Sequence, residues 1–314
     1  MCAFKQSEKG IYFKMEERYK HLNKFLKEKF GERTLKICVD GGFTCPNRDG
    51  SVGKGGCIFC SEKGSGEHIC SENSILEQVK QYFQSERSKR ANKYIVYFQN
   101  FTNTYDTTQN LKRKYDAALI DDRIVALAVA TRPDCINEDV VKLLKSYSKK
   151  YYVWVELGLQ TSNDETAKII NRGYKSEKFT EAVKILNKYE IDVVTHIMIG
   201  LPGETEKDLK NTVNFLNKHN YQGIKIHSTY VIENTVLAKM YKDGSYKEIS
   251  LEYYLQGLEY VLTHISPEII IHRISGDAPK DLLIVPQWNL HKKWILNGIE
   301  KRLKERDLWQ GKYF

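Results

Sequence analysis

Short apolar runs alternate with amphipathic stretches over most of this 314-residue chain. Apolar runs of this length are typical of strands buried in a parallel sheet. We predict strands at 35–39, 94–98, 124–130, 152–157, 193–199 and 223–227. Between them, apolar positions recur at helical spacing. That spacing predicts helices near 72–90, 107–120, 137–149, 176–189 and 204–218.

Six strand–helix units indicate an α/β fold built around a parallel sheet. A doubly wound sheet and a partial barrel both fit this pattern. In either fold the chemistry lies at the C-terminal ends of the strands. The residues that follow each predicted strand are therefore the candidate site.

The two ends of the chain differ from this repeating middle. Residues 15–30 have helical spacing and stop at Gly31, while the C-terminal part offers a helix at 249–265, an apolar run at 269–274 and a basic helix at 290–306. We expect these C-terminal elements to form a layer appended to the barrel. We accordingly divide the chain into an N-terminal basic helical segment (1–33), a barrel (34–230) and a C-terminal extension that packs on it (231–314).

The net charge of +9 is unevenly distributed. Residues 1–37 carry a surplus of +5 and residues 280–314 a surplus of +4, whereas the segment between them is neutral. If the two ends meet beside the barrel mouth, they form a surface that favours a polyanion such as RNA. The alternative is that lysine-rich helices are simply solvated.

The chain has no apolar run long enough to cross a membrane, and its first residues lack the apolar core of a signal peptide. We therefore expect a cytoplasmic protein with no membrane partner. In that compartment its seven cysteines are expected to be thiols or metal ligands rather than disulfides.

Three of these cysteines have the spacing of a metal site. Cys45, Cys57 and Cys60 follow the first predicted strand as Cys-x11-Cys-x2-Cys across a glycine-rich loop. A structural zinc site would need a fourth ligand, for which Cys38 or Cys70 is available. A redox Cys-x2-Cys leaves the third cysteine unexplained. An iron–sulfur cluster held by three cysteines leaves one iron open, and spacing alone does not separate it from zinc.

The rest of the chain favours the cluster. The loop DGGFTCPNRDG…GGCIFC, with Phe59 directly before Cys60, resembles the radical S-adenosylmethionine (SAM) superfamily, in particular its YhcC-like (MnmL-type) subgroup. The segment HIMIGLPGET at 196–205 resembles the related radical SAM domain of the Elongator catalytic subunit. This resemblance implies a partial (β/α)6 TIM-like barrel with an N-terminal helix and a C-terminal helical and strand extension.

The resemblance also implies which residues bind the cofactors. Cys45, Cys57 and Cys60 would hold a 4Fe-4S cluster, whose open iron binds the amino and carboxylate groups of SAM. The resemblance and the positions at strand ends imply SAM contacts at Phe59, Gln99, Asn100, Glu156, Gln160, Arg172, Met198 and Ile199.

The residues of this set have individual expected roles. Glu156 would bind the ribose of SAM, and Arg172 would face its carboxylate. Gln99 and Asn100 match the family only in position, as contacts for the amino group. Alternatively, Arg172 has a purely structural role at a helix C-terminus, where the helix dipole favours a basic residue and Gly173 forms the cap.

Some candidate residues have no assigned role. Cys38, Cys70 and Cys135 are not needed for the cluster, and no role follows for His196, His227 or Arg273.

The family chemistry implies that one electron cleaves SAM to methionine and a 5′-deoxyadenosyl radical, which takes a hydrogen atom from the substrate. Resemblance to the subgroup implies tRNA as that substrate and conversion of a 5-carboxymethylaminomethyl wobble uridine to its 5-aminomethyl form. The implied partners are a reducing donor such as a flavodoxin or ferredoxin, and a tRNA methyltransferase acting downstream. Two alternatives remain open, namely a radical SAM enzyme acting on a small metabolite or peptide and a non-catalytic, zinc-stabilised RNA-binding protein.

Overall fold

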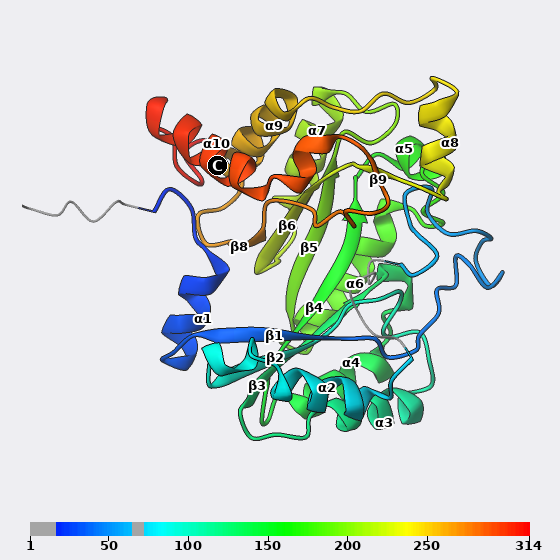
Figure 1. The fold of residues 1–314 in the computed structure, drawn as a ribbon, viewed down its shortest axis with the longest axis vertical. Helices are drawn as coiled ribbons and strands as arrows, with labels where there is room; N and C mark the ends of the chain where they lie inside the picture. The colour runs from blue at the N-terminus through cyan, green and yellow to red at the C-terminus, as the bar shows by residue number, and fades with distance from the viewer. Residues whose placement is uncertain (1–16, 65–71) are drawn as a thin grey trace, which may run out of the picture.

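Seven parallel strands form the centre of the molecule in a computed structural model that describes residues 17–64 and 72–314 (Figure 1). Their order in the sheet is β1-β2-β3-β4-β5-β6-β8. The strands are β1 (Thr34–Val39), β2 (Lys93–Phe98), β3 (Ile124–Thr131), β4 (Tyr152–Gln160), β5 (Asp192–Ile199), β6 (Gly223–Ser228) and β8 (Ile270–Arg273).

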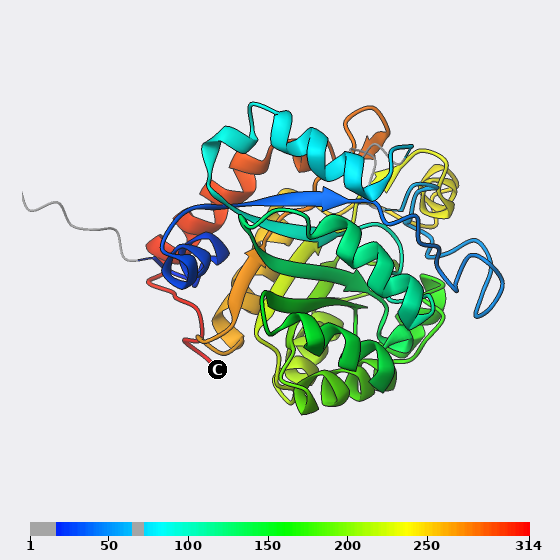
Figure 2. The same cartoon turned by 90° about the horizontal axis from the view of Figure 1, so that it is seen from below.

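Helices cover the outer face of this curved sheet (Figure 2). They alternate with the strands as the apolar pattern predicts, because each parallel pair needs a crossover. The crossover helices are α2 (Ile75–Gln84), α3 (Thr108–Ala118), α4 (Glu138–Tyr147), α5 (Asp164–Ile169), α6 (Ser176–Lys188), α7 (Glu206–Leu216), α8 (Val236–Lys242) and α9 (Leu251–His264). The prediction of a partial barrel is confirmed.

The C-terminal part contributes more to the barrel than the sequence pattern indicated. The apolar run at 269–274 was expected in an appended layer, but it forms β8, which pairs with β6 as a seventh parallel strand. A run of this length does not reveal which sheet it joins, since that depends on contacts made far away in the chain. A short antiparallel pair, β7 (Val231–Ile232) with β9 (Leu283–Val285), and the helix α10 (Lys292–Glu305) complete this part.

The N-terminal helix α1 (Leu22–Phe30) closes one end of the barrel interior. It contacts both edge strands, β1 and β8. Its residues Leu22 and Leu26 pack in a buried cluster with Trp154 of β4 and other inward-facing apolar side chains. The sequence predicted a helix from residue 15, and its first two residues lie outside the described part. Residues 18–21 are instead held by the C-terminal part, since Ile271 donates a backbone hydrogen bond to Lys20 and Gln310 donates one to Arg18.

No helix in the described part of the chain is long and apolar enough to cross a membrane.

We expect Leu26→Ala to lower the free energy of unfolding by about 2–5 kcal/mol, because it removes a side chain that is 3% exposed and leaves a cavity under the sheet. Lys27→Ala, at the neighbouring exposed position, should change it by no more than about 0.5 kcal/mol. Urea denaturation of both variants measures the difference. Equal effects would show that α1 does not form part of the barrel core.

Candidate active site

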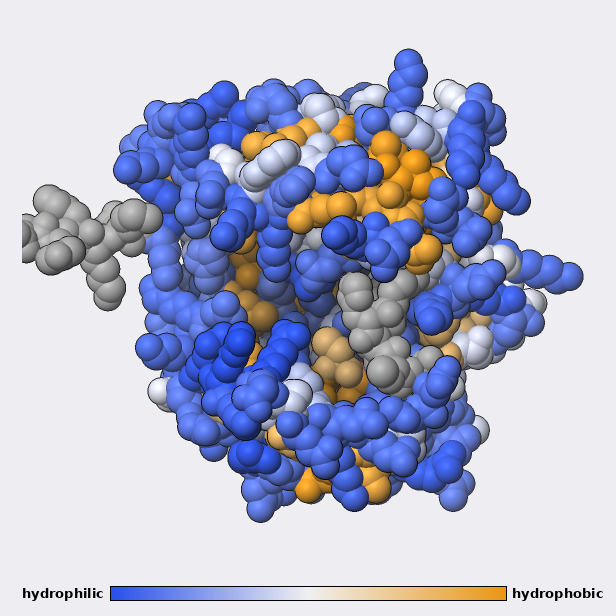
Figure 3. All heavy atoms as spheres, in the orientation of Figure 1, coloured by the Kyte–Doolittle hydropathy of each residue, from blue (hydrophilic) through white to orange (hydrophobic). Residues whose placement is uncertain are grey.

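A cavity of about 1220 Å³ occupies the interior of the half-barrel. It reaches from the loops that follow the strands to α1 and α10, and the face shown in Figure 3 is hollowed at its centre. Because seven strands do not close into a barrel, the inward-facing side chains line this space instead of filling it. Several inward-facing polar groups of the sheet, among them Lys36, Glu156 and Lys225, therefore line the cavity.

Three cysteines lie on one loop at the wall of this cavity. Cys45, Cys57 and Cys60 all line it. The loop turns at Cys45, whose carbonyl accepts hydrogen bonds from two amides downstream, and again between Cys57 and Cys60, joined by a backbone hydrogen bond of 3.0 Å. The Arg48 side chain donates to the Cys60 carbonyl at 3.1 Å. The loop is thus fixed so that its three thiols face one space.

The donor set fits an iron–sulfur cluster. Burial, helped by the nearby thiols of Cys60 and Cys45, raises the pKa of Cys57 to about 12. A thiolate here therefore needs a cationic centre. Zinc binds each sulfur at about 2.3 Å and brings its ligands close together, whereas each cysteine of a cluster binds a different iron. In residues 17–64 and 72–314, no three His, Cys, Asp or Glu side chains are grouped closely enough to hold a single metal ion.

The cysteine loop is tied to the turn after α5. Asn47 is fully buried, and its Nδ2 donates to the Asn171 carbonyl at 2.6 Å and to Cys57 Sγ at 3.9 Å. In return, Asn171 Nδ2 donates to the Gly56 carbonyl at 2.8 Å. A Cβ at Gly173, where φ is +82°, would lie 2.7 Å from Asn47 Oδ1. The Asn-Arg-Gly segment therefore fixes the position of the cysteine loop.

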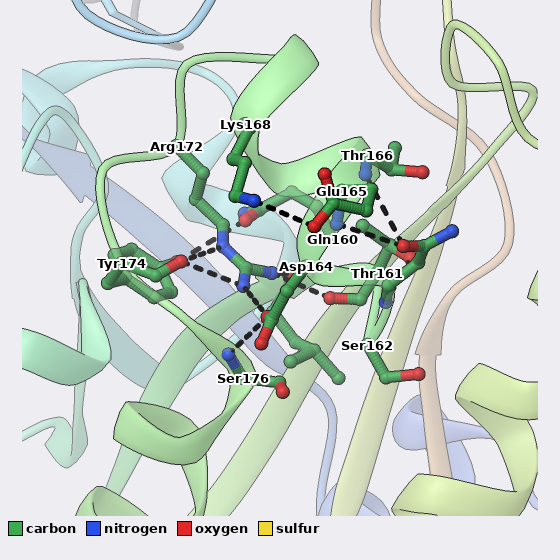
Figure 4. A network of polar contacts seen from close by, with 12 residues as sticks. Gln160, Thr161, Ser162, Asp164, Glu165, Thr166, Lys168, Arg172, Tyr174 and Ser176 are labelled. Carbon is green, nitrogen blue, oxygen red and sulfur yellow. Dashed lines mark hydrogen bonds and ion pairs between the residues drawn. The ribbon is translucent and has the colours of Figure 1, made fainter.

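Arg172 lies at the centre of this turn (Figure 4). Its guanidinium is fully buried and donates to the carbonyls of Leu159, Thr161 and Tyr174. It also pairs with Asp164 at 3.4 Å. The predicted contact of Arg172 with the SAM carboxylate stays a prediction, and in this structure the side chain joins the end of β4 to the turn that contacts the cysteine loop.

The structure brings most of the predicted cofactor residues to the cavity wall. Besides the cysteines, the lining includes Phe59, Gln99, Glu156, Gln160 and Met198. The lining does not include Asn100, Arg172 or Ile199.

Asn100 and Ile199 have other partners in this structure. The Nδ2 of Asn100 donates to Asp40 Oδ2 at 2.8 Å, and Ile199 belongs to the core on the outer side of the sheet. These neighbours leave their predicted SAM contacts untested.

A charged layer crosses the interior below the strand ends. The carboxylate of Glu156 accepts hydrogen bonds from Lys225 Nζ and from the Tyr97 hydroxyl, the latter at 2.6 Å. Lys36 Nζ lies 3.9 Å from its other oxygen. Burial raises the pKa of Glu156, but the two ammonium groups outweigh burial and hold it well below its usual range. Burial also lowers the pKa of Lys225 to about 8.

The wall of the cavity carries more cations than anions. Three acidic side chains line it, Glu156, Asp277 and Glu300, against seven basic ones. The basic set is Lys36, Arg48, Arg87, Arg132, Lys225, Arg273 and Lys292. Five of these basic residues and two of the acidic ones belong to the neutral segment 38–279, which therefore presents a positive inner surface.

The two basic ends lie apart from the cysteine loop. Residues of α1 and α10 line the cavity. Both helices lie on the side of the molecule away from the cysteine loop (Figure 2). Much of their charge is already paired, for example Arg302 with Glu252 at 2.7 Å and Arg18 with Asp307 at 2.9 Å. The ends thus border the cavity but do not flank the mouth formed by the strand ends.

Sequence reasoning assigned no cofactor role to several wall residues. Lys36 and Lys225 received none, although a lysine inside an apolar strand is an available signal for a buried charge. Cys38 also lines the cavity. Arg273 lines it too and pairs with Asp277 at 2.6 Å. Cys135 lies at a smaller hollow of about 580 Å³, and Cys70 falls outside the described residues.

Comparison with known proteins agrees with this architecture. The family model of the radical SAM superfamily matches residues 45–216, and that of the radical SAM C-terminal domain matches residues 221–305. The protein YtqA of Bacillus subtilis is 40% identical over 305 residues, covering 96% of this chain and 95% of YtqA. The protein YhcC of Escherichia coli is 36% identical over 264 residues, covering 84% and 85%.

More distant relatives are similar over part of their length. A tRNA uridine(34) acetyltransferase of Methanocaldococcus infernus is 30% identical over 166 residues, which cover 52% of this chain and 30% of that protein. The solved structure of Elp3 from the same organism superimposes with a TM-score of 0.66 at 19% identity, covering 88% of this chain and 64% of that one. The structural likeness shows that the half-barrel fold is shared. Because the family model spans more than half of its length and relatives match it nearly end to end, the chain belongs to the radical SAM superfamily, as an enzyme of the YhcC-like subgroup that uses a 4Fe-4S cluster and SAM.

Proposed function

We propose that this enzyme modifies the wobble uridine of tRNA, converting a 5-carboxymethylaminomethyl group to a 5-aminomethyl group. The observation that carries the proposal is the positive inner surface, seven basic side chains against three acidic ones, in the cavity that contains the cysteines. A nucleic acid that enters with one nucleotide extended suits a positively charged hollow of this size. About half of this chain is similar to a protein named tRNA uridine(34) acetyltransferase, and this similarity supports tRNA as the class of substrate.

The cofactors occupy the strand-end half of the cavity in this proposal. Cys45, Cys57 and Cys60 hold the cluster, and the adjoining wall residues Phe59, Gln99, Gln160 and Met198 contact SAM. The further SAM contacts implied by the family are Asn100, Glu156, Arg172 and Ile199. When bound, the cluster and SAM would supply one-electron cleavage of SAM and a carbon radical that takes a hydrogen atom from the carboxymethyl CH2 of the substrate. Loss of one further electron from that carbon, which the oxidised cluster can accept, and addition of water would then break the C–N bond, releasing the two-carbon group as glyoxylate and leaving the 5-aminomethyl group.

The residues of this chain position and protect that chemistry. The tie between Asn47 and the turn at 171–173 fixes the cysteine loop, so that the thiols keep one geometry. The apolar cluster under α1 seals the far end of the interior from water. The wall cations hold phosphates of the RNA in register.

The proposal includes two protein partners and a cellular compartment. A flavodoxin or ferredoxin supplies the electron, and a tRNA methyltransferase consumes the aminomethyl product. Since tRNA is the substrate, the enzyme acts in the cytoplasm.

Nucleoside mass spectrometry of bulk tRNA tests the substrate. In a strain that lacks the protein we expect 5-carboxymethylaminomethyluridine to accumulate and the 5-aminomethyl form and its methylated product to disappear. A plasmid copy should reverse this, and one carrying Cys57→Ala should not, because the cluster loses a ligand. Unchanged tRNA nucleosides would contradict the proposal and favour a small metabolite or peptide as substrate.

Anaerobic reconstitution tests the cysteine assignment. We expect about four irons per chain with charge-transfer absorbance, and SAM cleavage on reduction. Changing Cys45, Cys57 or Cys60 singly to Ala should abolish cleavage, while Cys135→Ala should leave iron content and cleavage intact. One zinc per chain with no SAM cleavage would instead support the zinc-stabilised RNA-binding alternative.

The salt dependence of tRNA binding tests the wall cations. Arg87 and Lys292 are exposed at the cavity rim, and no ion pair holds either of them within the described structure. Changing each to Met should reduce the slope of log Kd against log salt by about one, because each phosphate contact releases counterions. Lys142→Met, on the outer helix α4, is the matched control and should leave the slope unchanged. Equal slopes for all three variants would place the RNA elsewhere.

A further inference from the structure

The charged layer inside the barrel is not balanced. Glu156 contributes one negative charge, and its two oxygens face two ammonium groups, Lys225 in a hydrogen bond and Lys36 at 3.9 Å. The nearby Arg273 is already neutralised by Asp277 at 2.6 Å. The layer therefore holds one positive charge for which the described residues provide no counterion.

That surplus charge is enclosed. The side chain of Lys225 is 8% exposed, that of Lys36 25% and that of Glu156 4%. A charge removed from water is costly unless it is paired. Lys36 Nζ also lies over the rings of Tyr97 and Trp154, at 5.0 and 5.8 Å, but these neutral rings carry no net negative charge, so the second positive charge of the layer remains unmatched.

Imidazoles beside the layer also lack partners. The rings of His196, His227 and His272 line the cavity. A ring nitrogen of each, Nε2 of the first two and Nδ1 of the third, is buried without a hydrogen-bond partner in the described structure. Burial lowers the pKa of His196 to about 3 and those of the other two well below their usual value. These rings are therefore neutral, leave the positive surplus unchanged, and are not explained as satisfied core residues.

Strand register gives the depth of this layer. His196 pairs with Lys225 across β5 and β6, and one inward-facing position further on, Met198 pairs with His227. Glu156 lies four residues before the end of β4, roughly 13 Å along a regular strand. The layer thus lies below the strand ends and above the apolar cluster that α1 closes.

We propose that Lys36 and Lys225 form a subsite that binds a carboxylate of the substrate, at mid-depth in the barrel and beside the imidazoles of His196 and His272. One unmatched positive charge fits one carboxylate, and a charge-assisted hydrogen bond is strong at this burial. This rests on the proposed function, in which the substrate side chain ends in a carboxymethyl group. The subsite then selects the carboxymethylaminomethyl uridine and lets the aminomethyl product go.

SAM also carries a carboxylate, but the proposed cofactor arrangement places it at the cluster. The cysteine loop follows the C-terminal end of β1, whereas Lys36 lies within that strand, three residues before its end. The experiment below distinguishes binding of the substrate carboxylate from binding of the SAM carboxylate.

The test uses the reconstituted enzyme with SAM and three anticodon stem-loop RNAs that differ only at position 34. The three carry uridine, 5-methylaminomethyluridine or 5-carboxymethylaminomethyluridine, so the last two differ by the carboxylate. We expect the wild type to bind the carboxylate RNA about tenfold more tightly than the methylaminomethyl RNA, the value of one charge-assisted hydrogen bond. Lys36→Met and Lys225→Met should bring this ratio close to one.

A matched control separates this effect from general RNA binding. Lys292→Met removes the same type of cation at the rim and should weaken all three RNAs alike, leaving the ratio unchanged. If Lys225→Met fails to fold because Glu156 loses its partner, Lys36→Met decides, since Lys225 still neutralises Glu156 there.

Each outcome bears on the proposal. A ratio near one in the wild type, or an unchanged ratio in Lys36→Met, overturns it. Weaker SAM binding in Lys36→Met with an unchanged RNA ratio assigns the lysines to SAM and likewise overturns it. Mass spectrometry of the same reactions tests the proposed function separately. If the binding ratio depends on the lysines but no 5-aminomethyluridine forms, the subsite is supported and the proposed reaction is contradicted. If 5-aminomethyluridine forms but the binding ratio is near one, the reaction is supported and the subsite is contradicted.

Discussion

A parallel sheet of seven strands that does not close on itself has an interior it cannot fill. Its edge strands β1 and β8 stand apart, and α1 bridges them at only one end. Polar side chains that would be excluded from a packed barrel can therefore face inward. The cavity, the charged layer and the cysteine loop above it all depend on this incomplete closure.

The interior is organised in levels along the strands. Apolar residues around Trp154 and Leu26 seal the end near α1. Above them lies the layer of Lys36, Lys225 and Glu156, and the cysteines close the strand-end side. Alternation of side chains along each strand produces these levels, because every second residue faces the cavity and parallel register aligns them between neighbours.

The cysteine loop has few regular elements to hold it. Its position comes from single side chains instead, with Asn47 bonded to the Asn171 carbonyl and Arg172 bonded to three further carbonyls. These bonds give the carbonyls of the turn partners, although the Leu159 carbonyl also accepts from the Thr161 amide. An Asn-Arg-Gly segment thus has a structural use that a cofactor role alone does not reveal.

The sequence by itself determined the strand and helix succession, because periodicity is a local property. It indicated the partial barrel and the Cys45–Cys57–Cys60 cluster site only through its resemblance to the radical SAM superfamily. It did not determine that β8 joins the sheet, that Asn47 meets Asn171, or that Lys36 and Lys225 share Glu156. Those partners are tens to more than a hundred residues apart, and only the tertiary fold brings them together, by strand register within the sheet and by loop packing for Asn47 and Asn171. Tertiary structure also explains the positive charge of the cavity wall. A segment with zero net charge acquires a positive inner wall because folding turns more of its basic than of its acidic side chains towards the cavity.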